Sequence, residues 1–220
     1  MTRILLLFIC VLLTFSTNLF SQEEVDVFKR IFTYTDSLSK APQKGVVSND
    51  IAAVLTSLDK DHPVAFFEKT GELIKAGKFN DASLVFYVGY FRLEYFEITN
   101  PDYKPSERDT SAVAANPAIA QYIDLILRSD IDNFIKILDR TKNWLTNNDY
   151  QFNSKTKDPE KYNEYITHLD TLISDLTANK EKHQAQWATQ QTEIRKAIQE
   201  MEKSKQTPAK KTEKKAKKNP

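Results

Sequence analysis

The side chains best suited to metal binding or nucleophilic catalysis are scarce in this sequence. Of its three His, His168 stands four residues after Glu164, a spacing that places both side chains on one face of a helix. Two ligands do not complete a metal site, and no HExxH or CxxC pattern accompanies them. The single cysteine, Cys10, lies in the apolar N-terminal segment, and no G-x-S-x-G motif is present. The sequence therefore predicts no metal, no cofactor and no catalytic residue.

One carboxylate-bearing stretch leaves an enzymatic alternative open. Residues 101–116 contain Pro101 and Pro105 among charged side chains, which predicts a long connection that is irregular at its start. Connections of this length are often functional, although most loops only join elements. A carboxylate-dependent enzyme of unknown substrate would use Glu107 or Asp109 in this connection.

Aromatic side chains are concentrated between residues 84 and 98. Aromatic residues at helical spacing are more often core than ligand pocket, because they dominate the burial of apolar surface. The sequence does not separate these two interpretations. If this segment does line a groove, we expect its polar members to face the ligand. These members are Tyr87, Tyr90, Arg92, Glu94 and Tyr95.

The elements that position this aromatic segment form a helical hairpin over residues 62–100. Pro63 suits the first turn of one helix, and Gly77 suits its C-terminus, where a left-handed conformation closes the helix. Asn80 or Asp81 is expected to cap the second helix, which is apolar on most of its circumference and so predicts a central core helix. Gly89 within that helix indicates close approach by a neighbouring helix.

The centre of this hairpin resembles a tetratricopeptide repeat. The motif is Gly77-Lys78-Phe79 followed by Ala82, Phe86 and Gly89, and the resemblance covers residues 63–97, about one repeat of 34 residues. It implies an antiparallel helical hairpin that binds a protein partner on the side of its first helix. The partner-facing side chains would be Glu68, Lys69, Glu72 and Lys75. The wider pattern also resembles uncharacterised bacterial exported helical proteins, a likeness that implies no activity.

Three segments differ in composition along the chain. Residues 1–21 have Arg3 before a short apolar run, the pattern of a signal peptide cleaved near Ser21. Residues 22–202 predict a single all-α domain of six or seven helices, the last of which continues beyond Ala178 as an exposed arm or bends near Asn179. Residues 203–220 are rich in lysine without large apolar side chains and predict a disordered tail.

The net charge of +1 conceals an opposition between body and tail. Residues 203–220 carry eight Lys and one Glu, whereas residues 22–202 carry 22 basic and 29 acidic side chains, a net charge of −7. A lysine run attracts anionic lipid headgroups and phosphate without specificity of its own. We therefore expect at most weak lipid contact through the tail, or simple solvation, and no specific nucleic-acid binding.

These features together predict an exported, non-enzymatic protein of the bacterial envelope, periplasmic or secreted. Its expected role is to bind or scaffold another envelope protein, for example as an inhibitor or immunity-type protein, because an acidic helical body complements a basic cleft. A surface-associated structural protein tethered by its basic tail is the second alternative beside the carboxylate-dependent enzyme.

Overall fold

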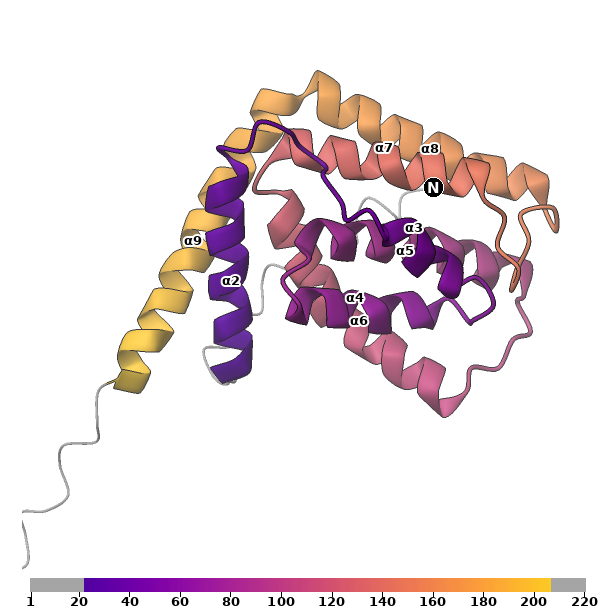
Figure 1. Ribbon diagram of the computed structural model, residues 1–220, viewed down its shortest axis with the longest axis horizontal. Coiled ribbons are helices and arrows are strands. Elements are labelled where there is room, and N and C mark those ends of the chain that lie inside the picture. Colours follow the sequence, from indigo (N-terminus) through magenta and orange to yellow (C-terminus); the bar gives the residue numbers. More distant parts are fainter. Residues whose placement is uncertain (1–21, 207–220) are drawn as a thin grey trace, which may run out of the picture.

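The computed structural model describes residues 22–206, which form eight α-helices and no β-strand (Figure 1). The helices are α2 (Gln22–Leu38), α3 (Ile51–Ser57), α4 (Val64–Lys75), α5 (Phe79–Thr99), α6 (Glu107–Leu127), α7 (Ile131–Asn147), α8 (Pro159–Ala178) and α9 (Lys180–Gln206). The all-α prediction is confirmed, and there is one helix more than the six or seven expected. The additional helix arises because the chain breaks at Asn179, whose side chain donates to Asp175 Oδ1 at 2.7 Å.

Helices α4 and α5 form the expected antiparallel hairpin at the centre of the fold (Figure 1). Gly77 closes α4 with a φ of 75°, the left-handed conformation that glycine adopts without strain. Gly89 lies where α4 crosses α5: a Cβ added there would lie 2.3 Å from Cβ of Phe66. The glycine therefore permits the close helix approach that the sequence indicates.

Helix α5 is buried around most of its circumference and is the core helix of the domain. It contacts α4, α6, α7 and α8, and Val85 and Val88 are fully buried among them. Because its apolar residues face all of these neighbours, α5 has no single apolar stripe of the kind found on a surface helix.

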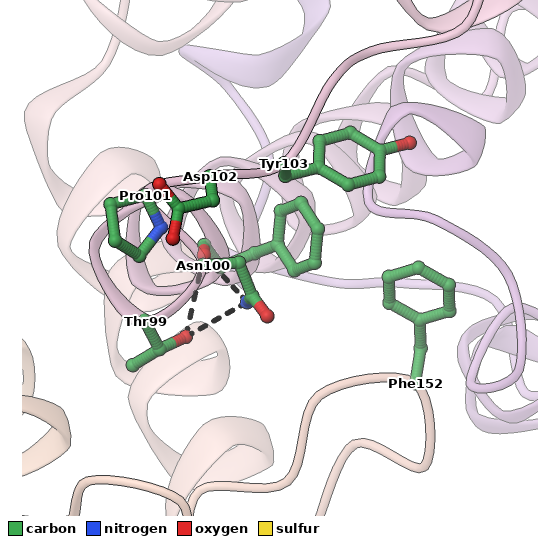
Figure 2. A pocket seen from close by; sticks show the side chains of 7 residues that line it. Thr99, Asn100, Pro101, Asp102, Tyr103 and Phe152 are labelled. Atoms are coloured by element: carbon green, nitrogen blue, oxygen red, sulfur yellow. Dashed lines mark hydrogen bonds between the residues drawn. The ribbon is translucent and has the colours of Figure 1, made fainter.

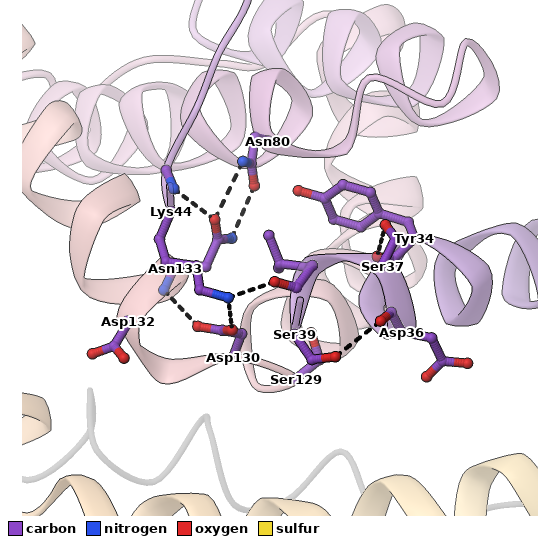
Figure 3. A network of polar contacts seen from close by, with 12 residues as sticks. Tyr34, Asp36, Ser37, Ser39, Lys44, Asn80, Ser129, Asp130, Asp132 and Asn133 are labelled. Carbon is purple, nitrogen blue, oxygen red and sulfur yellow. Dashed lines mark hydrogen bonds and ion pairs between the residues drawn. The ribbon is translucent and has the colours of Figure 1, made fainter. Parts of the chain in front are cut away.

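The start of α5 differs from the expectation. The helix begins at Phe79 with no side-chain cap, so Asn80 and Asp81 lie in its first turn instead of capping it. Asp81 Oδ1 accepts the backbone N–H of Ser48 at 2.8 Å, and Asn80 exchanges hydrogen bonds with Asn133 of α7. These residues therefore hold the connection 39–50 against α5 and α7 (Figure 3).

Helix α6 is much longer than expected and corrects the prediction of an irregular connection over residues 101–116. Ser106 and Asp109 form a reciprocal capping box that starts the helix, so that only residues 100–106 connect α5 to α6. Pro117 is tolerated inside α6 because it lies on an exposed face, where water can bond the carbonyl group that loses its partner.

Helices α2 and α9 lie side by side, although they are far apart in the sequence (Figure 1). Arg195 of α9 donates to Asp36 Oδ1 at 2.7 Å and stacks over the ring of Phe32, 4.2 Å from its centroid. Buried Trp187 and Ile198 attach α9 to the body, so this helix is not the exposed arm expected from its thin apolar pattern.

Two predicted segments fall at the ends of the chain. The signal-peptide segment 1–21 lies outside the described residues, as do residues 207–220 of the predicted tail. Residues 203–206 of that tail belong to α9. Within residues 22–206, no helix is long and apolar enough to cross a membrane.

Candidate binding cleft

An open cavity with chemically varied walls lies at the C-terminal end of α5. It has a volume of about 510 Å³ and is formed where the connections 100–106 and 148–158 come together (Figure 2). This volume lies within the usual range for ligand sites, about 300–1,000 Å³. The lining residues are Phe96, Thr99, Asn100, Pro101, Asp102, Tyr103 and Phe152.

One wall of the cleft is built from polar side chains that terminate α5. Asn100 Nδ2 donates to the carbonyl of Phe96 at 2.8 Å, and Thr99 Oγ1 donates to that of Tyr95 at 2.8 Å. These bonds satisfy carbonyl groups that a helix C-terminus leaves without partners. Asn153 of the facing connection donates to Thr99 Oγ1 at 3.1 Å and so joins the two walls.

The other wall is aromatic, with His62 packed behind it. The imidazole stacks on Tyr103 with ring centroids 5.2 Å apart and meets Phe96 and Phe152 edge to face at 4.9 and 5.5 Å. Tyr103 and Phe152 remain 41% and 39% exposed although they line a cleft. In Figure 2 both rings stand on the side of the cleft opposite Thr99 and Pro101.

His62 is held neutral by its surroundings. Its Nδ1 accepts the backbone N–H of Val64 at 3.3 Å, which places the proton of the neutral imidazole on Nε2. Burial lowers the pKa of His62, with Asp109 Oδ1 at 3.6 Å from Nδ1 opposing this effect and Arg108 adding to it. Nε2 is buried and has no hydrogen-bond partner among the described residues.

Asp109 fixes the position of the aromatic wall. Its Oδ2 accepts the hydroxyl groups of Ser106 and Tyr103, each at 2.7 Å. Hydrogen bonds from Ser106 and then from Tyr103 lower the pKa of Asp109 to about 2. The carboxylate is therefore ionised at neutral pH and serves to start α6 and to orient Tyr103. Glu107, the other carboxylate expected in this segment, is exposed.

Three of the side chains predicted to face a groove are buried instead. Tyr87 and Tyr95 pack within the core, and Arg92 is 3% exposed. Arg92 Nη1 donates to Asp59 Oδ1 at 2.8 Å, and the guanidinium lies 4.2 Å from the centroid of the Tyr150 ring. The correction follows from the burial of α5 on nearly all sides, which leaves these positions no route to solvent.

Tyr95 nevertheless contributes to the cleft indirectly. Its hydroxyl oxygen accepts the backbone N–H of Asp158 at 2.8 Å. The backbone N–H of Phe152 donates to the carbonyl of Asp59 at 2.9 Å. The connection 148–158 is thus tied to the body at Phe152 itself and at Asp158, and the aromatic wall is held in place.

The other two predicted groove residues, Tyr90 and Glu94, form a partly exposed pair away from the cleft. The Tyr90 hydroxyl donates to Glu94 Oε1 at 2.6 Å. Burial raises the pKa of Glu94, while this hydrogen bond lowers it. Burial, and after it the nearby Glu94 carboxylate, raises the pKa of Tyr165 of α8 to about 12.

The partner-facing residues expected on the first helix of the hairpin lie on the outer side of α4. Glu68 is paired with Arg108 of α6 (Nε to Oε1 at 3.0 Å), so α6 occupies part of this side. Lys69 donates to Glu72 Oε2 at 2.8 Å, and Glu72 and Lys75 are exposed to solvent. These four residues do not reach the aromatic cleft.

Phe96 belongs to the aromatic segment that could line a groove, and residues 101–103 fall in the connection considered as a functional loop, but the cleft itself and the part of Phe152 in it were not predicted from the sequence. The available signal was the presence of Tyr103 and Phe152 within segments rich in Pro, Asn and Ser, where an aromatic side chain has no helix to bury it. Across residues 22–206 no group of three or more His, Cys, Asp or Glu is placed to hold a metal ion. No family model, no curated protein and no solved structure matches this chain.

Proposed function

We propose that the protein is a non-enzymatic binding protein of the bacterial envelope that grips a protein partner at the aromatic cleft. The observation that carries this proposal is the pair of half-exposed aromatic side chains, Tyr103 and Phe152, on one wall of an open cleft. Tyrosine and phenylalanine are enriched at protein interfaces, and exposed apolar side chains grouped together commonly mark one.

The cleft is preorganised for binding. The Tyr103 hydroxyl is held by Asp109, and the ring is held by its stack on His62. Side chains that are already ordered lose little conformational entropy when a partner docks, so more of the contact energy appears as affinity. The Asp102 carboxylate lies beside the rings and supplies a site for a hydrogen bond or ion pair from the partner.

The charge of the body favours a basic partner. Residues 22–202 carry a net charge of −7, and an acidic surface accelerates association with a basic one. An inhibitor or immunity-type role against an envelope enzyme or toxin is the concrete form of this proposal. The envelope location follows from the signal-peptide pattern of residues 1–21.

The experiment compares cleft and control variants of the tagged protein after crosslinking in native envelopes. We expect one stoichiometric protein to be recovered with the unmodified chain and lost with Tyr103→Ala combined with Phe152→Ala. The matched control is Val46→Ala combined with Val113→Ala, which removes two side chains of similar exposure elsewhere. Recovery of the same protein by the cleft variant, or of no protein by any form, contradicts the proposal.

A truncation separates the cleft from the basic tail. Because α9 ends at Gln206, a chain ending there keeps every described helix and loses most of the lysines. We expect this chain to retain the partner. Loss of the partner, together with salt-sensitive sedimentation of the full chain on anionic vesicles, would instead favour the surface-tethered structural protein.

A further inference from the structure

A second open groove lies between α3 and α7, away from the aromatic cleft. It has a volume of about 300 Å³, at the lower end of the range for ligand sites, about 300–1,000 Å³. Its size suits a small ligand rather than a long one. The groove is lined by Val47, Ile51, Ala52, Leu55, Leu84, Arg140, Asn143, Trp144, Asn147 and Asn148.

The floor and the wall of this groove differ in chemistry. The floor is aliphatic and buried, formed by Ile51 and Leu55 of α3 with Leu84 of α5. The wall is the polar side of α7, where residues 140, 143, 144, 147 and 148 recur at the spacing of one helix face. A ligand that fits both must combine a hydrocarbon part with a polar end.

Because Arg140 is positively charged, it favours a ligand whose polar end is negatively charged. It is the one charged side chain among the lining residues, and no carboxylate lies with it. Its Nε donates to the carbonyl of Gly45 at 2.6 Å, which fixes the guanidinium at the edge of the groove. Among the described residues its two terminal nitrogens make no hydrogen bond, so the exposed guanidinium is oriented by Gly45 and accessible to an anion.

Trp144 supplies an independent indication of a ligand acceptor. Its indole Nε1 is buried and has no hydrogen-bond partner among the described residues. A buried donor without an acceptor is costly, and native proteins rarely leave one unpaired. Trp144 lies one helical turn after Arg140, and both residues line the groove.

We propose that this groove binds a small aliphatic carboxylate. The hydrocarbon chain lies on the floor of Ile51, Leu55 and Leu84, and the carboxylate accepts hydrogen bonds from Arg140 and Trp144. The connection 39–50 completes the site, because it carries Val47 and is held in place by Asn133 and Asn80 (Figure 3) and by the bond of Ser48 to Asp81. This site is separate from the aromatic cleft and does not depend on the proposed function.

The test follows the two indole N–H signals in ¹H–¹⁵N spectra of the ¹⁵N-labelled protein during titration with hexanoate. Trp144→Phe assigns the signal of Trp144, since the chain has two Trp. We expect hexanoate to move the Trp144 signal downfield and to saturate, with the Trp187 signal unchanged. Hexanamide, which has the same shape without the charge, is expected to bind about tenfold more weakly or worse, because hydrogen bonds between charged groups are the stronger ones.

Variants of α7 assign the binding to the groove. Arg140→Gln is expected to weaken hexanoate binding about tenfold or more, whereas Lys136→Gln, which removes the same charge one turn earlier outside the groove, leaves it unchanged. Arg140→Lys keeps the charge and is expected to retain part of the affinity, which separates ligand binding from loss of the Gly45 contact. Equal binding of hexanamide, equal weakening by Lys136→Gln, or no saturable shift of the Trp144 signal overturns the proposal.

Discussion

The two ends of α5 carry similar polar residues but use them differently. At the N-terminal end, Asn80 and Asp81 bond to Asn133, Val46 and Ser48. These bonds hold the connection 39–50 against the body. At the C-terminal end, Thr99 and Asn100 close the helix beside aromatic rings that remain half-exposed. At the N-terminal end the polar side chains hold a connection against the body, whereas at the C-terminal end aromatic rings beside the polar side chains remain exposed as a surface.

The largest stability effect is expected at the closed end. Asn133→Ala removes the acceptor of the Gly45 N–H, the donor to Asn80 Oδ1 and one of the two acceptors of Asn80 Nδ2, which keeps only the carbonyl of Val46. Leaving these buried groups unpaired is expected to lower the free energy of unfolding by about 3 kcal/mol. Chemical denaturation measures this change.

The matched control is Asn143→Ala on the same helix, an exposed residue that is expected to change stability by no more than about 0.5 kcal/mol. Partner recovery through the cleft should be unaffected by Asn133→Ala at temperatures where the variant is folded. A stability change as small as that of the control would break the comparison, because the closed end would then not depend on its polar bonds.

The second prediction concerns Asp109 at the open end. Asp109→Asn weakens the capping box and the bond that orients Tyr103. It is expected to lower the free energy of unfolding by about 2 kcal/mol at pH 7. The pKa of this carboxyl is about 2 in the folded protein and near 3.9 in an unfolded chain, so the folded state favours ionisation. Its stabilising contribution is therefore present above about pH 4 and is lost as the pH falls toward 2.

Acid titration of stability distinguishes the variant from the unmodified protein. The difference in unfolding free energy between the two is expected to shrink as the pH falls through this window. A difference that stays constant with pH would show that Asp109 acts through packing and not through its charge.

The third prediction distinguishes two contributions of Tyr103: the hydroxyl bond that orients the ring, and the ring surface that is available to a partner. Tyr103→Phe keeps the ring but removes the hydroxyl bond to Asp109 Oδ2, and is expected to cost about 1 kcal/mol of stability. Partner affinity should fall less than with Tyr103→Ala, since the stacking surface is retained. Quantitative pulldown of the crosslinked partner measures both variants, and equal losses would mean that the hydroxyl, not the ring, is recognised.

The smallest expected effect is a pH slope from His62. Burial lowers the pKa of His62 below the ordinary 6.5. Between the pKa of the folded protein and 6.5, the unfolded state therefore binds more protons than the folded state. Stability is therefore expected to rise with pH through the interval below 6.5 and to be lost as the pH falls. NMR titration of the imidazole and stability measurements on His62→Phe check this, and a pKa above 6.5 would contradict it.

Local sequence signals were sufficient for much of the scaffold. Pro63, Gly77 and Gly89 marked the start, the turn and the close contact of the α4–α5 hairpin, and each acts through its own backbone or through a missing side chain. The capping box at Ser106 was present in the sequence, but the neighbouring prolines and charges outweighed it, and α6 was predicted ten residues too short.

The sequence by itself determined the all-helical class, the central position of α5 and the opposition of an acidic body to a basic tail, because periodicity and composition are local properties. Only the tertiary structure decided that Tyr87, Arg92 and Tyr95 are buried, and that Tyr103 and Phe152 line one wall of the same cleft. The physical reason is that burial depends on which distant segments cover a residue. Phe152 reaches the same wall as Tyr103 because bonds to distant residues, among them Asp59 and Tyr95, hold the connection 148–158 against the body.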